Sequence, residues 1–263
     1  MVRLALRGVP LGPADQPIQA VLFDKDGTLS ISEPMLQTLA QARVFQCRQL
    51  LAEAHPELGN AAGAELELLL LRAYGLDAHG VHPAGTTAVA SREHNLISTA
   101  TTLAQVGVGW PEALAISEAA FAATDSLHGT GSDQAPMTTD GLQPLLEGLA
   151  RAGVCCGVIS NDERAGIAAF LANHGLSGYF QACWSAEHRP RKPDPAAVHA
   201  LCDALQVPAQ ACALIGDANS DLRMAQAARV PVVLGYTSGW RRPPQLDPRF
   251  PQLNHWSELS LLD

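Results

Sequence analysis

Two aspartates separated by one residue follow a short apolar run near the start of the chain. Residues 20–23 (Ala-Val-Leu-Phe) predict a buried strand, and Gly27 breaks this pattern just after Asp24 and Asp26. On an extended chain the two carboxylates share one face. Two like charges this close repel each other unless a cation lies between them. The stretch therefore predicts a site for a hard cation such as Mg²⁺, which prefers oxygen ligands.

A calcium loop and a plain turn are the alternative interpretations of this motif. An EF-hand loop that began at Asp24 would need Gly at its sixth position and Glu at its twelfth. Those positions hold Leu29 and Met35, and the segment before them is a predicted strand rather than a helix. These residues argue against an EF-hand, whereas the motif alone leaves a structural turn open.

A second strand end carries a small hydroxyl residue. Residues 154–159 predict a strand, and Ser160 and Asn161 follow it where a helix begins. Ser160 could hydrogen-bond a phosphoryl oxygen, because backbone donors and positive partial charge gather at a helix N-terminus. Alternatively, Ser160 or Asn161 could simply be the N-cap of that helix.

A third strand end carries two more carboxylates. Residues 211–215 predict a strand, after which Asp217 and Asp221 stand four residues apart. Asp217 lies where the strand ends, and Asp221 lies near the start of the following helix. The alternative is that Asn219 or Asp221 caps the following helix.

A cluster of cations precedes the predicted helix that opens at Asp194 and Pro195. Arg189, Arg191 and Lys192 fall within four residues, just before this helix. A basic turn exposed to solvent is the alternative.

The chain after residue 136 alternates strands and helices, which is typical of a parallel sheet. The patterns predict strands over residues 154–159, 182–185, 211–215 and 231–234, and helices over residues 139–152, 162–174, 194–205 and 219–228. They also allow a strand over residues 3–6 and a terminal helix from His255. The expected fold is an α/β doubly wound, Rossmann-like parallel sheet. Ligands bind at the carboxyl edge of such sheets, so the polar strand ends should converge there.

An all-helical segment is expected to interrupt this sheet. Apolar residues recur at helical spacing from residue 35, and no convincing strand is found before residue 130. The expected helices follow Pro34 and cover residues 61–74, 91–106 and 110–127. We therefore expect a core domain of residues 1–32 and 136–263 and a helical cap domain of residues 33–135. A lid would be useful at that edge of the sheet.

Composition narrows the class of protein. The chain has 263 residues, 47% apolar content and a formal net charge of −9, which argues against nucleic acid as a partner. No apolar run is long enough to span a membrane, and residues 1–17 lack the apolar core of a signal peptide. The six cysteines form no CxxC pair. We expect a cytoplasmic protein that is a monomer or homodimer.

Taken together, these motifs resemble the haloacid dehalogenase (HAD) superfamily. The stretch Asp24-Lys25-Asp26-Gly27-Thr28 is similar to the DxDGT motif of its phosphatase branch. Ser160, Lys192 and the pair Asp217 and Asp221 match the three later motifs in the family's order. The resemblance covers residues 20–240, and the helical insertion resembles a C1-type cap. Within the superfamily, the chain looks like phosphoglycolate phosphatases and their relatives.

The resemblance implies a mechanism for phosphate esters. Asp24 would be the nucleophile that forms an aspartyl-phosphate, and Asp26 the general acid and base. Ser160, Asn161, Lys192 and the residues Gly27 and Thr28 would hold the phosphoryl oxygens. Mg²⁺ would be bound by Asp24, Asp217 and the backbone carbonyl of Asp26, and Asp221 would support the metal or Lys192.

The motifs constrain the enzyme subclass and the substrate less than they constrain the superfamily. The acid at Asp26 disfavours a dehalogenase, since halide needs no proton to leave. A phosphomutase similar to β-phosphoglucomutase shares the same motifs, and a non-catalytic binding protein is a further alternative. Residues 33–135 hold 4 Lys/Arg and 11 Asp/Glu, which favours a small phosphorylated metabolite over a polyanion. Arg92, followed by His94 and Asn95, is the cap residue that we expect to contact the substrate.

Overall fold

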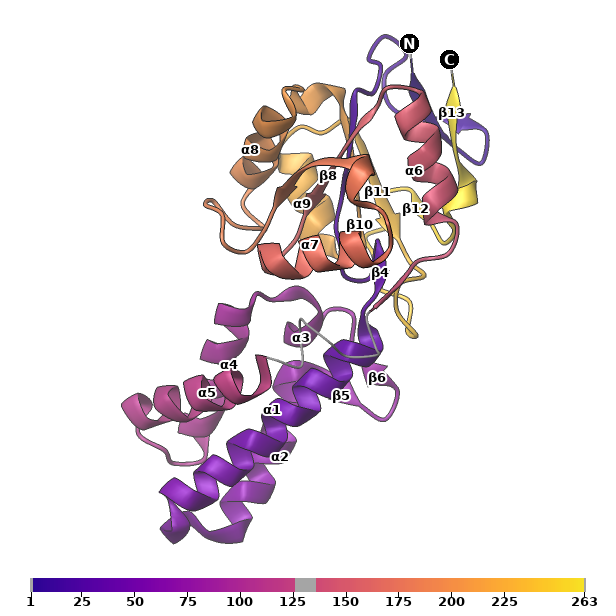
Figure 1. The fold of residues 1–263 in the computed structure, drawn as a ribbon. Helices are drawn as coiled ribbons and strands as arrows, with labels where there is room; N and C mark the ends of the chain where they lie inside the picture. The colour runs from indigo at the N-terminus through magenta and orange to yellow at the C-terminus, as the bar shows by residue number, and fades with distance from the viewer. Residues whose placement is uncertain (1, 126–135, 263) are drawn as a thin grey trace. The chain divides into compact units, whose positions relative to one another are not determined.

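The computed structural model describes residues 2–125 and 136–262, and these fall into two compact units (Figure 1). The first unit combines Met1–Ser32 with Pro136–Asp263, and the second is Glu33–Ala135. Within the described ranges, no helix joins the length and apolar character that a membrane crossing requires.

A six-stranded sheet forms the centre of the first unit. All neighbouring strands run parallel, in the order β12-β11-β10-β3-β8-β9. The strands are β3 (Ala20–Phe23), β8 (Cys155–Ile159), β9 (Phe180–Trp184), β10 (Cys212–Gly216), β11 (Val232–Tyr236) and β12 (Gln252–Leu253). The chain leaves β3 first towards β8 and β9, and later returns on its other side with β10. The loop after β3 therefore lies at the topological switch point, where ligands bind in such sheets.

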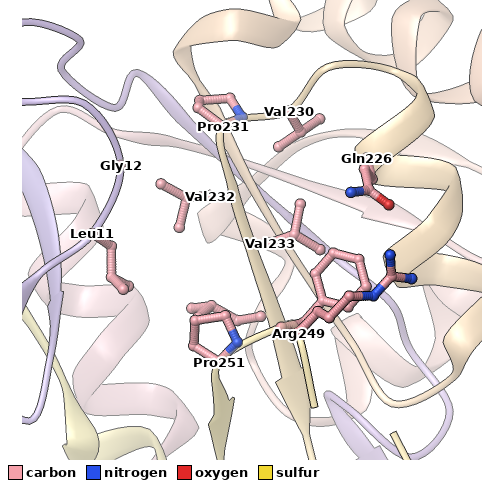
Figure 2. Close-up of a pocket in the computed structure, with 11 residues that line it drawn as sticks. Leu11, Gly12, Gln226, Val230, Pro231, Val232, Val233, Arg249 and Pro251 are labelled. Carbon is pink, nitrogen blue, oxygen red and sulfur yellow. The ribbon is translucent and has the colours of Figure 1, made fainter. Parts of the chain in front are cut away.

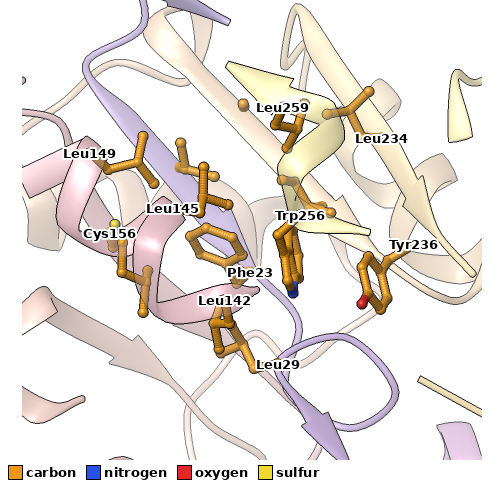
Figure 3. Close-up of a cluster of buried hydrophobic side chains, with 14 of the residues drawn as sticks. Phe23, Leu29, Leu142, Leu145, Leu149, Cys156, Leu234, Tyr236, Trp256 and Leu259 are labelled. Atoms are coloured by element: carbon orange, nitrogen blue, oxygen red, sulfur yellow. The ribbon is translucent and has the colours of Figure 1, made fainter. Parts of the chain in front are cut away.

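Helices cover both faces of this sheet because successive strand residues point to opposite sides. Val21 and Phe23 pack into the cluster that includes α6 (Leu142–Arg151) and α7 (Arg164–Asn173). Leu22 packs into the other cluster, with α8 (Pro195–Leu205) and α9 (Asn219–Ala227). Figure 3 shows Phe23 amid the leucines of α6, with Trp256 and Tyr236 beside it. The predicted doubly wound α/β fold is confirmed.

The C-terminal helix predicted from His255 is wrong. Residues Trp256–Glu258 form a single 3₁₀ turn, and Leu259–Leu262 is a strand, β13. This strand pairs antiparallel with β1 (Arg3–Leu6), which in turn pairs with β2 (Val9–Pro10). Long-range pairing of the two chain ends thus decides the conformation of a segment too short for a stable helix.

Helices dominate the second unit. They are α1 (Glu33–Ala54), α2 (Gly59–Tyr74), α3 (Thr86–Val89), α4 (Arg92–Gln105) and α5 (Trp110–Thr124), with a 3₁₀ turn at Pro56–Leu58. The expectation of no strand here is wrong in one detail, since β5 (Leu76–Asp77) and β6 (Gly80–Val81) form a small hairpin. Positive φ angles occur at Gly75, just before β5, and at Gly80, where β6 begins after the turn. At the boundary of the first unit, β4 (Ser30–Ile31) pairs with β7 (Met137–Thr138).

A cavity of about 260 Å³ lies at the amino end of β11 (Figure 2). Val230, Pro231 and Val232 line it together with Leu11 and Pro251. The predicted polar residues follow the carboxyl ends of the strands, so this cavity lies at the wrong end of the sheet to be their site.

Candidate active site

Three buried carboxylates meet at the carboxyl edge of the sheet. One ligand oxygen each of Asp24, Asp217 and Asp221 lies within 4.8 Å of the others. Asp24 directly follows β3, Asp217 follows the adjacent β10, and Asp221 is in the first turn of α9. Because β3 and β10 are parallel neighbours, their ends bring together residues almost 200 positions apart. Oxygen donors at this spacing suit a divalent metal ion.

The ammonium group of Lys192 lies against this triad. Its Nζ is 2.6 Å from Asp24 Oδ1 and 2.8 Å from Asp221 Oδ1, and it also donates to the carbonyl of Ile159 at 3.2 Å. One ammonium cannot balance three carboxylates, so two negative charges stay uncompensated when all are ionised. A buried excess of this size matches a divalent cation.

The pKa values of the triad reflect the same excess. Burial, then repulsion from Asp221 and Asp26, raises the pKa of Asp24 to about 6, against the opposing attraction of Lys192. Burial and the charges of Asp24 and Asp221 also raise the pKa of Asp217 well above its ordinary value. Without a metal, Asp24 and Asp217 therefore retain protons more readily, at the position where a cation would otherwise bind.

Both oxygens of Asp217 accept hydrogen bonds from fixed donors. Thr28 Oγ1 donates to Oδ1 at 3.0 Å, and the indole Nε1 of Trp240 donates to Oδ2 at 2.6 Å. Trp240 reaches Asp217 across Gly27, whose φ is +82°. A Cβ at Gly27 would lie 2.0 Å from Trp240 Nε1 and 2.5 Å from Asp217 Oδ2. The glycine after Asp26 is thus required both by the turn and by this close approach.

Asp26 does not belong to the carboxylate triad of Asp24, Asp217 and Asp221. The side-chain groups of Lys25, Ser30 and Ser32 all donate to its Oδ1: Lys25 Nζ at 2.6 Å, Ser30 Oγ at 3.3 Å, and Ser32 Oγ most closely. The structure therefore separates the two aspartates of the first motif into different environments, as two carboxylates with different tasks require. The predicted metal contact of Asp26 through its backbone carbonyl stays a prediction.

The backbone amides that follow Asp26 are used within the turn itself. Gly27 N donates to Ser30 O at 2.9 Å, and Thr28 N donates to Lys25 O at 3.2 Å. Their predicted role in holding phosphoryl oxygens stays a prediction, and it would require these bonds to be shared or exchanged.

The capping interpretation of Ser160 and Asn161 is wrong. The helix α7 begins at Arg164, with Glu163 as its N-cap. Ser160 is buried, and its Oγ accepts a hydrogen bond from Asp162 N at 3.1 Å. At the other strand end, the N-cap of α9 is Ala218, so neither Asn219 nor Asp221 caps that helix. The helix-capping alternative therefore fails at both strand ends.

The remaining cations of the motif hold their own loop. Arg189 Nη1 donates to the carbonyls of Ala186 and His188 at 3.1 and 3.0 Å, and Arg191 Nε donates to Ala186 O at 2.6 Å. Among the described contacts of Arg189, Arg191 and Lys192, those of Lys192 reach the carboxylate triad.

Arg92 belongs to the second unit, where it opens α4. Its guanidinium forms a two-pronged ion pair with Asp125, with Nε 3.1 Å from Oδ1 and Nη2 2.7 Å from Oδ2. Arg43 also approaches Asp125 Oδ1, at 3.7 Å, and stacks over Phe121. The assignment of Arg92 to substrate binding stays a prediction.

Sequence reasoning missed Lys25, Asp162 and Trp240. Lys25 could have been noticed, because it and Lys192 are the only lysines among the 17 basic residues of the chain. Asp162 lies directly after the second motif. Nothing in the sequence marks Trp240, which comes to the site through the path of the loop after β11.

Comparison with known proteins identifies the family. The model of the haloacid dehalogenase-like hydrolases matches residues 18–229. A phosphoglycolate phosphatase of Rhodospirillum rubrum is 31% identical over 232 residues, which cover 86% of this chain and 82% of that protein. A phosphoglycolate phosphatase of Yersinia pestis is 27% identical over 85% of this chain and 82% of its own length.

A solved structure shows the same fold. A putative haloacid dehalogenase-like hydrolase from Bacteroides fragilis covers 92% of this chain and 99% of its own, with 20% identity and a TM-score of 0.60. The predicted enzyme class, a phosphoric monoester hydrolase of the HAD superfamily, is confirmed by the family match together with the curated relatives. The chain therefore belongs to the haloacid dehalogenase-like hydrolase family, as a member similar to its phosphoglycolate phosphatases.

Proposed function

We propose that this enzyme is a Mg²⁺-dependent phosphatase that hydrolyses a small phosphate monoester through an aspartyl-phosphate on Asp24. The observation that carries the proposal is the buried triad of Asp24, Asp217 and Asp221 with Lys192 bound to two of its members. This arrangement supports the proposal because it would hold a divalent cation and a phosphoryl group side by side.

In the first half of the reaction, a carboxylate oxygen of Asp24 attacks phosphorus. The bond between phosphorus and the ester oxygen breaks, and Asp26 gives its proton to the departing oxygen. The alcohol leaves, and the phosphoryl group stays on Asp24. Lys192, already 2.6 Å from Asp24 Oδ1, is in reach of the transferred oxygens.

In the second half, Asp26 accepts a proton from water as the water oxygen attacks phosphorus. The bond between phosphorus and Asp24 breaks, which returns Asp24 as a carboxylate and releases inorganic phosphate. Mg²⁺ held by Asp24 and Asp217 supplies charge shielding between the nucleophile and the phosphoryl group. Asp221 contributes by holding Lys192, through the 2.8 Å contact between its Oδ1 and Nζ.

The substrate proposal is a small phosphorylated metabolite, with 2-phosphoglycolate as the first candidate because the relatives carry that name. The excess of acidic residues over residues 33–135 supports a small monoester over a polyphosphate. The enzyme would act in the cytoplasm as a monomer or homodimer.

The test is phosphate release from a panel of small phosphate esters, with Mg²⁺ and with EDTA. The wild type is expected to release phosphate only with Mg²⁺, and Asp24→Asn is expected to lower turnover by at least about a thousandfold. Asp203→Asn, an exposed change on α8, is the matched control and should keep full activity.

Two outcomes would contradict the proposal. Equal activity in Asp24→Asn and wild type would exclude Asp24 as the nucleophile. Phosphate release from no ester by folded wild type, with product formed only after a sugar bisphosphate is added, would favour the phosphomutase alternative.

A further inference from the structure

Lys25 is a buried cation held between two carboxylates. Its Nζ lies 2.6 Å from Asp26 Oδ1 and 2.9 Å from Asp162 Oδ2, and its side chain is 3% exposed. Burial alone would lower the pKa of Lys25, but attraction from Asp26 and Asp162 outweighs this and raises the pKa above its ordinary value. Lys25 is therefore held by carboxylates on both sides.

The ion pairs join two loops of the active edge. Lys25 and Asp26 follow β3, whereas Asp162 follows β8. Asp162 is itself held, because its Oδ1 accepts from Glu163 N at 2.7 Å and its own N–H donates to Ser160 Oγ at 3.1 Å. A continuous chain of contacts therefore runs from Asp26 through Lys25 and Asp162 to Ser160, the proposed phosphate-binding hydroxyl.

Lys25 also restrains the carboxyl group of Asp26. Lys25 Nζ and Ser32 Oγ both donate to Asp26 Oδ1. The single hydroxyl proton of Ser30 is within reach of the same oxygen, at 3.3 Å, and of the backbone carbonyl of Lys25, at 3.2 Å. The ion pair also limits rotation of the carboxyl group, because turning it would break the contact with Lys25.

A purely structural role is the alternative explanation for this cluster. Buried ion pairs are often replaceable by apolar residues at little cost in stability, since desolvation offsets their attraction. Two buried charged groups, Lys25 and Asp162, beside the half-buried Asp26 are therefore poor evidence for stability alone. Their contact with the carboxyl group that would transfer the proton offers a more specific explanation.

We propose that Lys25 is a positioning residue that holds the carboxyl group of Asp26 in place for proton transfer to the leaving oxygen. The proposal rests on the phosphatase function proposed above. In the first half-reaction the proton passes from the carboxyl group of Asp26 to the ester oxygen as the bond between that oxygen and phosphorus breaks. Lys25 keeps its own protons throughout. Esters of alkyl alcohols, which leave poorly as anions, depend on this proton, whereas esters of acidic phenols do not.

The experiment compares two leaving groups in Lys25→Met and wild type, with Mg²⁺ present. One substrate is p-nitrophenyl phosphate, and the other is the best alkyl phosphate of the panel. We expect kcat/KM for the alkyl ester to fall at least about tenfold and that for the aryl ester less than about threefold. The ratio kcat/KM is used because it reports the steps up to phosphorylation of Asp24, where the leaving group departs.

Arg189→Met is the matched control, because Arg189 is a cation of a neighbouring loop that donates to backbone carbonyls. It should leave the ratio of the two kcat/KM values unchanged. Asp162→Asn keeps Lys25 but weakens its anchor, so it should shift the ratio in the same direction by less. If Lys25→Met does not fold, the double variant Lys25→Met/Asp162→Asn removes one unpaired buried carboxylate and is measured instead.

Each other result overturns the inference. An equal fall for both esters would assign Lys25 a structural role, and so would failure of all these variants to fold. If Lys25→Met left kcat/KM unchanged for both esters, Lys25 would have no role in proton transfer. Wild type that releases phosphate from no ester contradicts the proposed function itself, whereas active wild type with an unselective Lys25→Met contradicts only the role of Lys25.

Discussion

The indole of Trp240 donates a hydrogen bond from Nε1 to Asp217 Oδ2 over 2.6 Å. Trp240 is 5% exposed and Asp217 is 3% exposed, so water does not compete for this bond. The contact orients a carboxylate that we propose as a metal ligand, and partners of this kind commonly tune metal affinity. It also places an aromatic chromophore next to the proposed metal site.

Replacing Trp240 is expected to weaken metal binding. In Trp240→Phe, Asp217 Oδ2 loses its donor, and the Mg²⁺ concentration for half-maximal activity should rise about tenfold or more. Trp184→Phe is the control, since Trp184 Nε1 donates to a backbone carbonyl, that of Pro190. Tryptophan fluorescence should respond to Mg²⁺ in wild type and in Trp184→Phe but not in Trp240→Phe. An unchanged Mg²⁺ dependence in Trp240→Phe would refute the role of this bond.

Gly27 is expected to tolerate no side chain. Gly27→Ala adds a Cβ 2.0 Å from Trp240 Nε1, and it also strains a backbone with φ of +82°. Gly175 has a similar φ of +66° but open space around its Cβ position, so Gly175→Ala measures the backbone strain alone. We expect Gly175→Ala to lower stability by about 1 kcal/mol. Gly27→Ala should lower it clearly more and remove most activity, as urea denaturation and phosphate release would measure. Equal losses would show that the loop after β11 moves aside.

Stabilisation by Mg²⁺ should increase with pH. The folded pKa of Asp24, about 6, exceeds its ordinary value of 3.8, so the metal-free native state binds the extra proton. This group therefore lowers metal-free stability as pH rises from 3.8 to about 6, and the loss stays constant above that. Asp217 acts in the same direction. Because Mg²⁺ competes with these protons, it should raise the melting temperature more at about pH 7.5 than at about pH 5.

Differential scanning fluorimetry with Mg²⁺ or EDTA across this range measures the effect. Asp24→Asn should remove much of the pH dependence, because an amide does not titrate. A shift in melting temperature that shrinks as pH rises would mean that Mg²⁺ binds away from the triad.

The two lysines of the chain offer a direct spectroscopic probe. Both are buried and each contacts two carboxylates, so ¹⁵N-lysine labelling should give two side-chain ammonium signals that exchange slowly with water. Lys25→Met assigns them. Mg²⁺ should shift the Lys192 signal more than the Lys25 signal, because Lys192 contacts two members of the triad. The opposite order would point to a metal site near Asp26 and Asp162.

The alternation of strands and helices was sufficient to predict the sheet, because each strand of a parallel sheet is a short apolar run that local pattern reveals. Segments whose conformation depends on distant partners were predicted poorly. The strand β13 exists because Leu259 and its neighbours pair with β1 at the other end of the chain. The hairpin of β5 and β6 is too short for any periodic signal.

The sequence by itself determined that Asp24, Ser160 and Asp217 follow the carboxyl ends of strands, since an apolar run and the polar residue after it are adjacent in the chain. Only the tertiary structure decided how these ends are joined. Strand order sets β3 between β10 and β8, so Lys192 reaches Asp24 across 168 positions and Trp240 reaches Asp217. The tertiary structure also decided that the side chain of Lys25 pairs with Asp26 and Asp162 and not with the triad. Contacts between distant segments depend on packing of the whole core, which no local pattern encodes.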